Sequence, residues 1–181
     1  SGFVRIESTN EITKAITKLA ADPMNDILAT FIPEEQFPAF LSGDFERLDT
    51  SKICFAKIYK KMKRVRPKPS LLNQTKEAMM KHGDQLFFKM KGIIGKYYDK
   101  RSKTLSEDFD AELATKLSDI VILPIHEERA SHFAFSGFFK LSHSGVTEIS
   151  TSTCSMIYTK NTMPQLVVQG NKADLKWTRR V

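Results

Sequence analysis

The sequence predicts an α+β protein in which a helical first two thirds, with one early strand, packs on a small C-terminal antiparallel β-meander. Apolar residues recur at helical spacing through much of residues 1–128, and one β-prone run interrupts them at residues 53–59. From Phe133 onward the apolar period changes to two. With 181 residues, 41% of them hydrophobic, the chain can bury a core, and we expect one domain over residues 1–181.

Residues 1–51 are expected to form a helical N-terminal region after a short strand-like start. Apolar residues recur at helical spacing on both sides of Pro23: Ile12, Ile16, Leu19 and Ala20, then Met24, Ile27, Leu28 and Phe31. Phe37, Phe40 and Leu41 follow as an apolar patch. We expect this patch to pack in the core, and the alternative is a docking surface for another subunit.

Residues 52–69 are expected to form a strand followed by a basic arm. The run Ile53–Tyr59 is rich in residues that favour strands. Lysine and arginine then dominate residues 60–68, and Pro67 and Pro69 disfavour both a helix and a central strand. We therefore expect residues 60–69 to be extended and exposed.

Residues 70–128 are expected to be helical. Apolar residues recur every seven positions, in Leu72, Met79, Leu86 and Ile93, with a predicted break near His82-Gly83. Leu113, Leu117 and Ile120 continue the apolar face, and the run 120–125 predicts a buried strand or a helix end. Gly92 and Gly95 superficially match the Gly-x-x-Gly loop of an RNA-binding module, but close helix packing explains them better.

Residues 129–181 are expected to form the antiparallel β-meander. Alternating aromatic residues from Phe133 lead to the turn-forming segment 142–145, and a β-branched, Ser/Thr-rich strand follows from Val146 to Tyr158. The segments 166–168 and 175–177 are two further short strand candidates.

Positive charge is concentrated in one block. Residues 52–103 hold 16 Lys or Arg against three acids, a net charge of +13, whereas the whole chain carries +7. Residues 104–128 carry −6. Such a block predicts an anionic partner, and the alternation of sign predicts contact between the acidic face of one subunit and the basic face of another.

The best-supported functional hypothesis is a non-enzymatic, basic structural protein that binds nucleic acid, with RNA favoured, and self-assembles into homo-oligomers. Release of counterions from phosphates would drive binding. Small basic proteins of this character serve as nucleocapsid, coat or matrix components of RNA viruses. The candidate nucleic-acid-binding residues are Lys57, Lys60, Lys61, Lys63, Arg64, Arg66, Lys68, Lys89, Lys91, Lys96, Lys100 and Arg101. Aromatic residues in the same block are candidates for base stacking, although we expect Phe87 and Phe88 to lie in the core.

A peripheral, matrix-type protein that binds anionic lipid is the alternative, because the same lysines would be attracted to an anionic membrane. A metal-dependent nuclease is a lower alternative. No apolar run reaches the roughly 18 residues of a membrane-spanning helix, and the N-terminus lacks the features of a secretory signal. We therefore expect an intracellular or virion protein that is neither secreted nor membrane-spanning.

No motif in the sequence identifies a reaction, so we expect no catalytic residue, no metal and no cofactor. His126 and His132 flank Glu127 but are six residues apart, which would place them on different sides of a helix, unlike the four-residue spacing of a zinc protease helix. Cys54 and Cys154 are a hundred residues apart, and we expect free thiols rather than a disulfide.

Overall fold

The protein is built on one antiparallel sheet. The computed structural model describes residues 2–7, 13–14, 17, 24–44, 47–49, 51–109, 115–143 and 146–180. Eight strands in this part of the chain form the sheet, in the order β1-β2-β3-β8-β7-β6-β4, with β5 also pairing with β6. The strands are β1 Phe3–Ile6, β2 Asn25–Pro33, β3 Ile53–Tyr59, β4 Thr115–Ile122, β5 Glu127–Arg129, β6 His132–His143, β7 Val146–Ile157 and β8 Gln165–Asn171.

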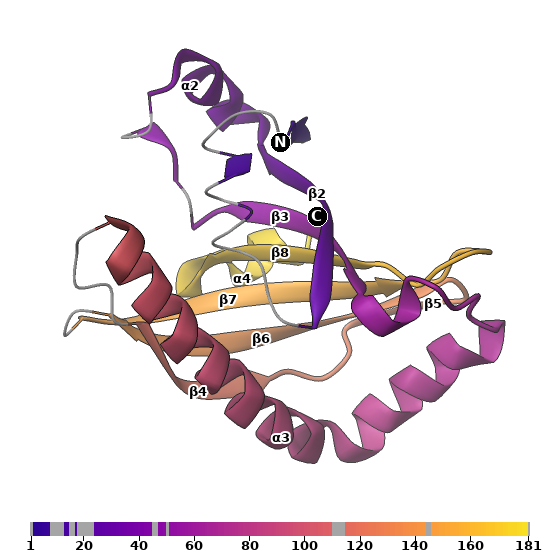
Figure 1. Cartoon of the computed structure of the whole chain (residues 1–181). Coiled ribbons are helices and arrows are strands. Elements are labelled where there is room, and N and C mark those ends of the chain that lie inside the picture. Colours follow the sequence, from indigo (N-terminus) through magenta and orange to yellow (C-terminus); the bar gives the residue numbers. More distant parts are fainter. Residues whose placement is uncertain are drawn as a thin grey trace.

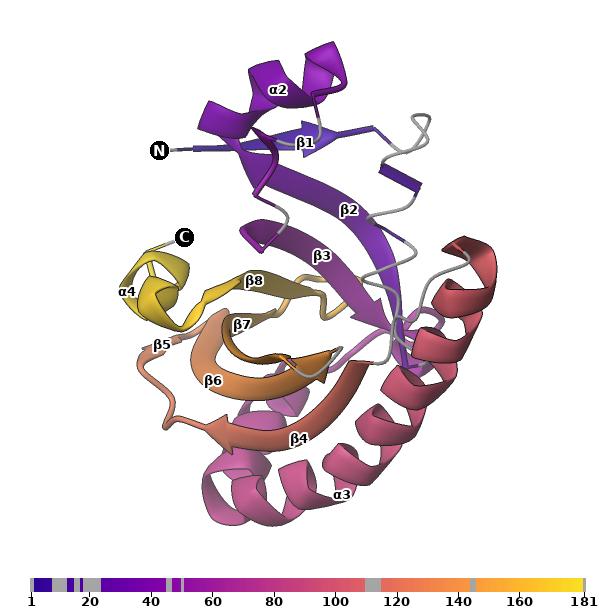
Figure 2. The same ribbon diagram turned by 90° about the vertical axis from the view of Figure 1, so that its left-hand side faces the viewer.

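Helices cover both faces of this curved sheet (Figures 1 and 2). The long helix α3 spans Pro69–Phe109, whereas α2 (Phe37–Ser42) and α4 (Leu175–Thr178) are short. The 3₁₀ helices are η1 Glu34–Gln36, η3 Lys60–Met62 and η4 Lys172–Asp174. The first half of α3 buries Leu72 against Phe133 and Met156, and α2 buries Phe40 against strands β1–β3.

The predicted fold class is wrong, because the first two thirds of the chain are not mainly helical but supply strands β1 to β4. Residues 24–33 were expected to be helical and form β2, and residues 115–122 form β4. Both strands contain a register shift, between Ile27 and Ala29 in β2 and between Leu117 and Asp119 in β4. In β4 the extra residue puts Leu117 and Ile120 on one face at a spacing of three, which imitates a helix. In β2 apolar residues occupy both faces, since Ile27 and Phe31 point to opposite sides of the sheet, and together they resemble helical spacing.

Other elements follow the prediction. The strand at 53–59 and the hairpin of β6 and β7 are confirmed, as is the strand at 166–168, which lies within β8. The predicted strand at 175–177 is wrong, because these residues form α4 after a capping box between Asn171 and Asp174. Most of the predicted helix over residues 12–20 lies outside the described residues. Ser144 and Gly145 of the predicted hairpin turn also lie outside them.

The predicted break in the long helix is confirmed. His82 has the non-helical backbone angles φ −134° and ψ 16°, and α3 bends there to follow the sheet (Figure 1). The predicted seven-residue apolar stripe is buried only before the bend, since Leu72 is buried while Leu86 and Ile93 are exposed. Phe40 of the N-terminal apolar patch is buried as expected, but Leu41 is exposed.

The two cysteines are free thiols on opposite faces of the sheet. Cys54 pairs with Val168, which pairs with Thr153, so the neighbouring Cys154 points to the other face. Burial raises the pKa of each thiol to about 12, so both are protonated at neutral pH.

Two glycine substitutions are expected to have opposite effects on stability. A Cβ at Gly92, in α3, would meet no heavy atom within 4 Å, so Gly92→Ala should stabilise the protein by up to about 1 kcal/mol through helix propensity. A Cβ at Gly137, in β6, would lie 2.7 Å from Ile122 Cδ1 and 3.1 Å from the Val121 carbonyl oxygen, so Gly137→Ala should destabilise it by about 1–3 kcal/mol. Urea unfolding measures both changes. If Gly92→Ala is clearly destabilising, that face of α3 is packed against something.

Candidate functional site

The basic arm, residues 60–68, connects the end of β3 to the start of α3. It begins with the 3₁₀ helix η3, so its first residues are not extended as predicted. The Lys60 amide donates a hydrogen bond to the Met24 carbonyl oxygen at 2.9 Å, and the Tyr158 hydroxyl donates to the Pro67 carbonyl oxygen at 3.5 Å. Pro67 is buried, whereas the basic side chains of the arm are exposed. The arm is therefore anchored near both ends with its cations facing solvent.

The cations of the arm divide into two groups. Lys63 Nζ lies 2.9 Å from Asp26 Oδ2, and Lys60 Nζ lies 4.0 Å from Asp26 Oδ1. In the described part of the chain, no carboxylate lies within ion-pairing distance of the other four cations, which are Lys61, Arg64, Arg66 and Lys68. These four, which we call the unpaired arm cations, are available to an anionic ligand.

The remaining predicted binding residues lie outside the arm, on β3 and in the second half of α3. Lys57 is buried, with 8% of its surface exposed, and its Nζ lies 5.2 Å from the centre of the Phe55 ring, so we leave it out of the candidate surface. In the second half of α3, Lys89 and Lys96 are exposed, and Lys91 Nζ lies 3.4 Å from Asp119 Oδ1. The side chains of Lys100 and Arg101 lie outside the described residues.

The second half of α3 also carries exposed apolar side chains. Phe88, which we expected in the core, is 79% exposed, and that expectation is wrong. Met80 is 69% exposed just before the bend, and Leu86 and Ile93 are partly exposed after it. Gly92 and Gly95 face open space, so no packing within the described chain accounts for the two glycines. Basic and apolar side chains thus share this exposed helix.

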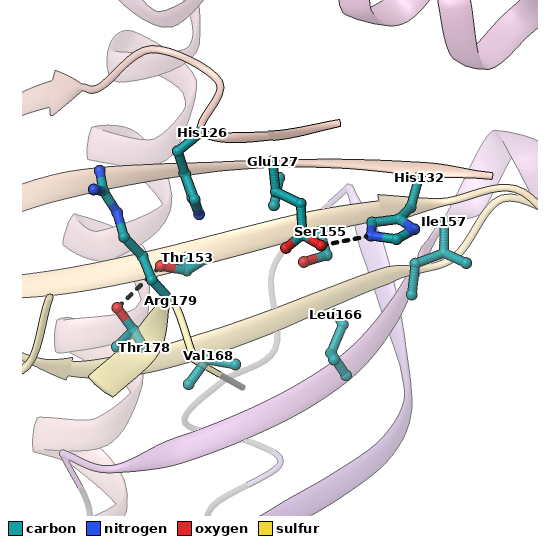
Figure 3. A pocket seen from close by; sticks show the side chains of 11 residues that line it. His126, Glu127, His132, Thr153, Ser155, Ile157, Leu166, Val168, Thr178 and Arg179 are labelled. Atoms are coloured by element: carbon teal, nitrogen blue, oxygen red, sulfur yellow. Dashed lines mark hydrogen bonds and ion pairs between the residues drawn. The ribbon is translucent and has the colours of Figure 1, made fainter. Parts of the chain in front are cut away.

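A polar pocket lies on the opposite face of the sheet from the first half of α3 (Figure 3). Its volume is about 220 Å³. Alternate residues of β6, β7 and β8 form its floor, β5 and the residue before it contribute one side, and the end of α4 closes it. The lining residues are His126, Glu127, His132, Ala134, Thr153, Ser155, Ile157, Leu166, Val168, Thr178 and Arg179.

A chain of hydrogen bonds runs beneath one end of the pocket. Arg179 Nε donates to Ser136 Oγ at 3.1 Å, and Ser136 Oγ lies 2.8 Å from Thr153 Oγ1. Thr153 donates to Thr178 Oγ1 at 2.9 Å, and Thr178 donates to the Leu175 carbonyl oxygen at 3.0 Å. A guanidinium only donates and a carbonyl only accepts, so the two ends fix the direction of every bond. The chain therefore holds the Arg179 side chain in place.

His126, Glu127 and His132 line the other side of the pocket. His132 Nε2 lies 3.2 Å from Glu127 Oε1, and Arg129 Nε lies 3.4 Å from the same oxygen. The hydrogen bond from His132 is the main reason that the pKa of Glu127 is lowered, so this carboxyl is ionised at neutral pH. Burial, followed by the charge of Arg179, lowers the pKa of His126, which is therefore neutral at pH 7.

The pocket brings together residues that the sequence interpretation kept apart. The six-residue separation of His126 and His132 would separate their side chains on a helix. A tight hairpin instead pairs Arg129 with His132 and Glu127 with Ala134, so Glu127 and His132 point to one face. The signal in the sequence was the turn at Ala130-Ser131 beside the alternating run that starts at His132. Nothing in the sequence indicated the contribution of Arg179.

Comparisons with protein-family models, with curated proteins and with solved structures gave no match.

In the described ranges of the chain, no group of three or more His, Cys, Asp or Glu side chains is arranged to hold a metal ion. In the same ranges, no helix has both the length and the apolar character that crossing a membrane requires.

Proposed function

We propose that the protein is a non-enzymatic, basic structural protein that binds nucleic acid, with RNA favoured, through phosphate contacts of the basic arm. The observation that carries the proposal is the set of four unpaired arm cations, exposed within nine residues of a segment that is anchored near both ends. Elsewhere, Lys76 and Lys91 of α3 already pair with Glu128 and Asp119. The exposed lysines of α3, Lys81, Lys89 and Lys96, are spread along the helix, so the arm has the densest group of available cations in the basic block.

Phosphate contact at the arm would be favourable for two physical reasons. Each cation that neutralises a phosphate releases condensed counterions, which provides a sequence-independent attraction. The contacts of Lys60 and Pro67 fix the backbone before binding, so less conformational entropy is lost on association. Neither reason selects a base sequence, so the proposal is for binding along the backbone.

Self-assembly remains part of the proposal. It is supported by the alternation of charge along the chain, with +13 in residues 52–103 and −6 in residues 104–128. A coat or matrix protein that binds RNA inside a cell or a virion would need both properties. Light scattering with and without RNA measures assembly directly.

The arm proposal predicts a specific loss in the triple variant Lys61→Ala, Arg64→Ala, Arg66→Ala. Binding to single-stranded RNA should weaken for all sequences, and the slope of log K against log salt should become shallower by about 2, because each phosphate contact to a single strand contributes about 0.7. Fluorescence anisotropy across a salt series measures both quantities. Lys60 and Lys63 are not substituted, because both form ion pairs with Asp26.

The matched control removes the same charge elsewhere, in Lys140→Ala, Lys172→Ala, Lys176→Ala. These three lysines are exposed and lie toward the other end of the sheet. The control should keep a slope close to that of the parent protein. Equal losses in the two triple variants would mean that net charge, and not the arm, determines binding, and the proposal would be wrong.

A second candidate function is binding to an anionic membrane surface. The observation that favours it is the exposure of Met80, Leu86, Phe88 and Ile93 on α3, among the exposed lysines 81, 89 and 96. A helix that combines exposed apolar and basic side chains is typical of proteins that lie in the headgroup region of a bilayer.

The membrane candidate predicts co-sedimentation with phosphatidylserine-containing vesicles and not with pure phosphatidylcholine vesicles. The double variant Met80→Ser, Phe88→Ser should lose most of this binding while keeping its affinity for RNA. Leu41→Ser is the matched control, because Leu41 is 69% exposed on a different helix. Absence of vesicle binding by the parent protein, or an equal loss in the control, contradicts the candidate.

A further inference from the structure

The polar pocket has a cation with no anionic partner. Arg179 is half-buried, and in the described part of the chain no carboxylate lies within ion-pairing distance of it. Its Nε is satisfied by Ser136, which is fully buried, so its two terminal amino groups are the donors that remain for another partner. A partly desolvated guanidinium without a counter-charge is costly, and an anion bound in the pocket would offset that cost.

The side chains around Arg179 suit an oxyanion. His126 stands beside it in the pocket (Figure 3) and is neutral at pH 7, so it offers an N–H donor without adding charge. Thr178 and Thr153 give their protons to the hydrogen-bond chain, so these hydroxyls mainly position Arg179. Glu127 carries a negative charge that would repel an anion. It already pairs with Arg129 and His132, toward the other side of the pocket.

The rest of the pocket indicates what the anion is attached to. The middle of the floor is Ser155, flanked by Ala134 and Leu166 on the neighbouring strands, with Ile157 toward one end and Val168 toward the other. Beyond it, Glu127 and His132 offer an acceptor and an imidazole at the end away from Arg179 (Figure 3). A volume of about 220 Å³ is more than a bare phosphate fills, and a larger ligand would extend past the exposed His126 into solvent.

We propose that this pocket binds a nucleoside monophosphate unit, with the phosphate on Arg179 and His126, the ring over Ser155 between Ala134 and Leu166, and a polar edge at Glu127 and His132. The unit is either a free mononucleotide or the phosphorylated end of an RNA. The pocket site goes beyond the proposed function and uses none of the arm cations.

Two titrations of the parent protein test the ligand class. AMP and UMP should bind measurably, and the amide NMR signals of Ser155 and Thr178 should shift to saturation as they are added. The corresponding nucleosides and inorganic phosphate should bind at least about tenfold more weakly. Tighter binding of a short RNA with a 5′- or 3′-phosphate than of its hydroxyl-ended equivalent identifies an RNA end as the source, and equal binding of the two RNAs identifies free mononucleotide. No binding of AMP and UMP, or shifts confined to the basic arm, overturns the proposal.

Variants test whether Arg179 is the contact. Arg179→Gln should weaken mononucleotide binding by at least about tenfold, because it removes a charge-assisted pair of hydrogen bonds. Arg180→Gln is the matched control, because its side chain is exposed and outside the pocket lining, and it should bind as the parent does. Ser136→Ala, which removes only the hydroxyl that holds Nε, should cause a smaller loss. Circular dichroism confirms that each variant is folded.

The pocket proposal can fail while the arm proposal holds, and the arm proposal can fail while the pocket proposal holds. Arg179→Gln should leave the salt slope unchanged for an RNA with hydroxyl ends, which has no terminal phosphate to place on Arg179, and the arm triple variant should leave mononucleotide affinity unchanged. If Arg179→Gln and Arg180→Gln lose equal affinity, the binding reflects surface charge alone and the pocket assignment is wrong.

Discussion

The antiparallel pairing of β3 with β8 joins the two halves of the chain into one sheet. Residues 53–57 lie against residues 165–169, so this pairing closes a loop of more than a hundred residues. It also determines where both candidate sites stand. The arm leaves the sheet where β3 ends, beside the segment between β7 and β8, and Tyr158 of that segment contacts Pro67. The pocket floor uses the face to which Val168 of β8 points.

The two sites differ in how they would hold an anion. The unpaired arm cations are exposed and hydrated, so they suit a repeating phosphate backbone and a salt-sensitive interaction. Arg179 is held by a directed chain of hydroxyl groups inside a small pocket, so it suits a single phosphate in one orientation. Partial desolvation, followed by the charge of Arg179, lowers the pKa of His126, so His126 is neutral beside it.

Sequence patterns predicted the parts of the fold in which the local spacing of apolar, turn and glycine residues matches the secondary structure that forms. The β6–β7 hairpin has alternating apolar residues around a turn segment, and the break at His82 follows from the neighbouring Gly83. Strand β2 was predicted as a helix because its apolar residues lie on both faces of the sheet, and only the end of β4 was anticipated as a strand, because a bulge puts Leu117 and Ile120 on one face at a spacing of three. The exposed basic arm could be anticipated from Pro67 and Pro69, but the pocket could not, because Arg179 and His126 meet only through tertiary structure.

Lysine footprinting tests most directly whether the unpaired arm cations contact nucleic acid. The protein is acetylated briefly with and without saturating single-stranded RNA, and mass spectrometry measures the modification of each lysine. If the arm contacts RNA, Lys61 and Lys68 should become protected while Lys140, Lys172 and Lys176 do not change. Unchanged labelling of Lys61 and Lys68, together with protection of Lys81, Lys89 and Lys96 on α3, would contradict this contact.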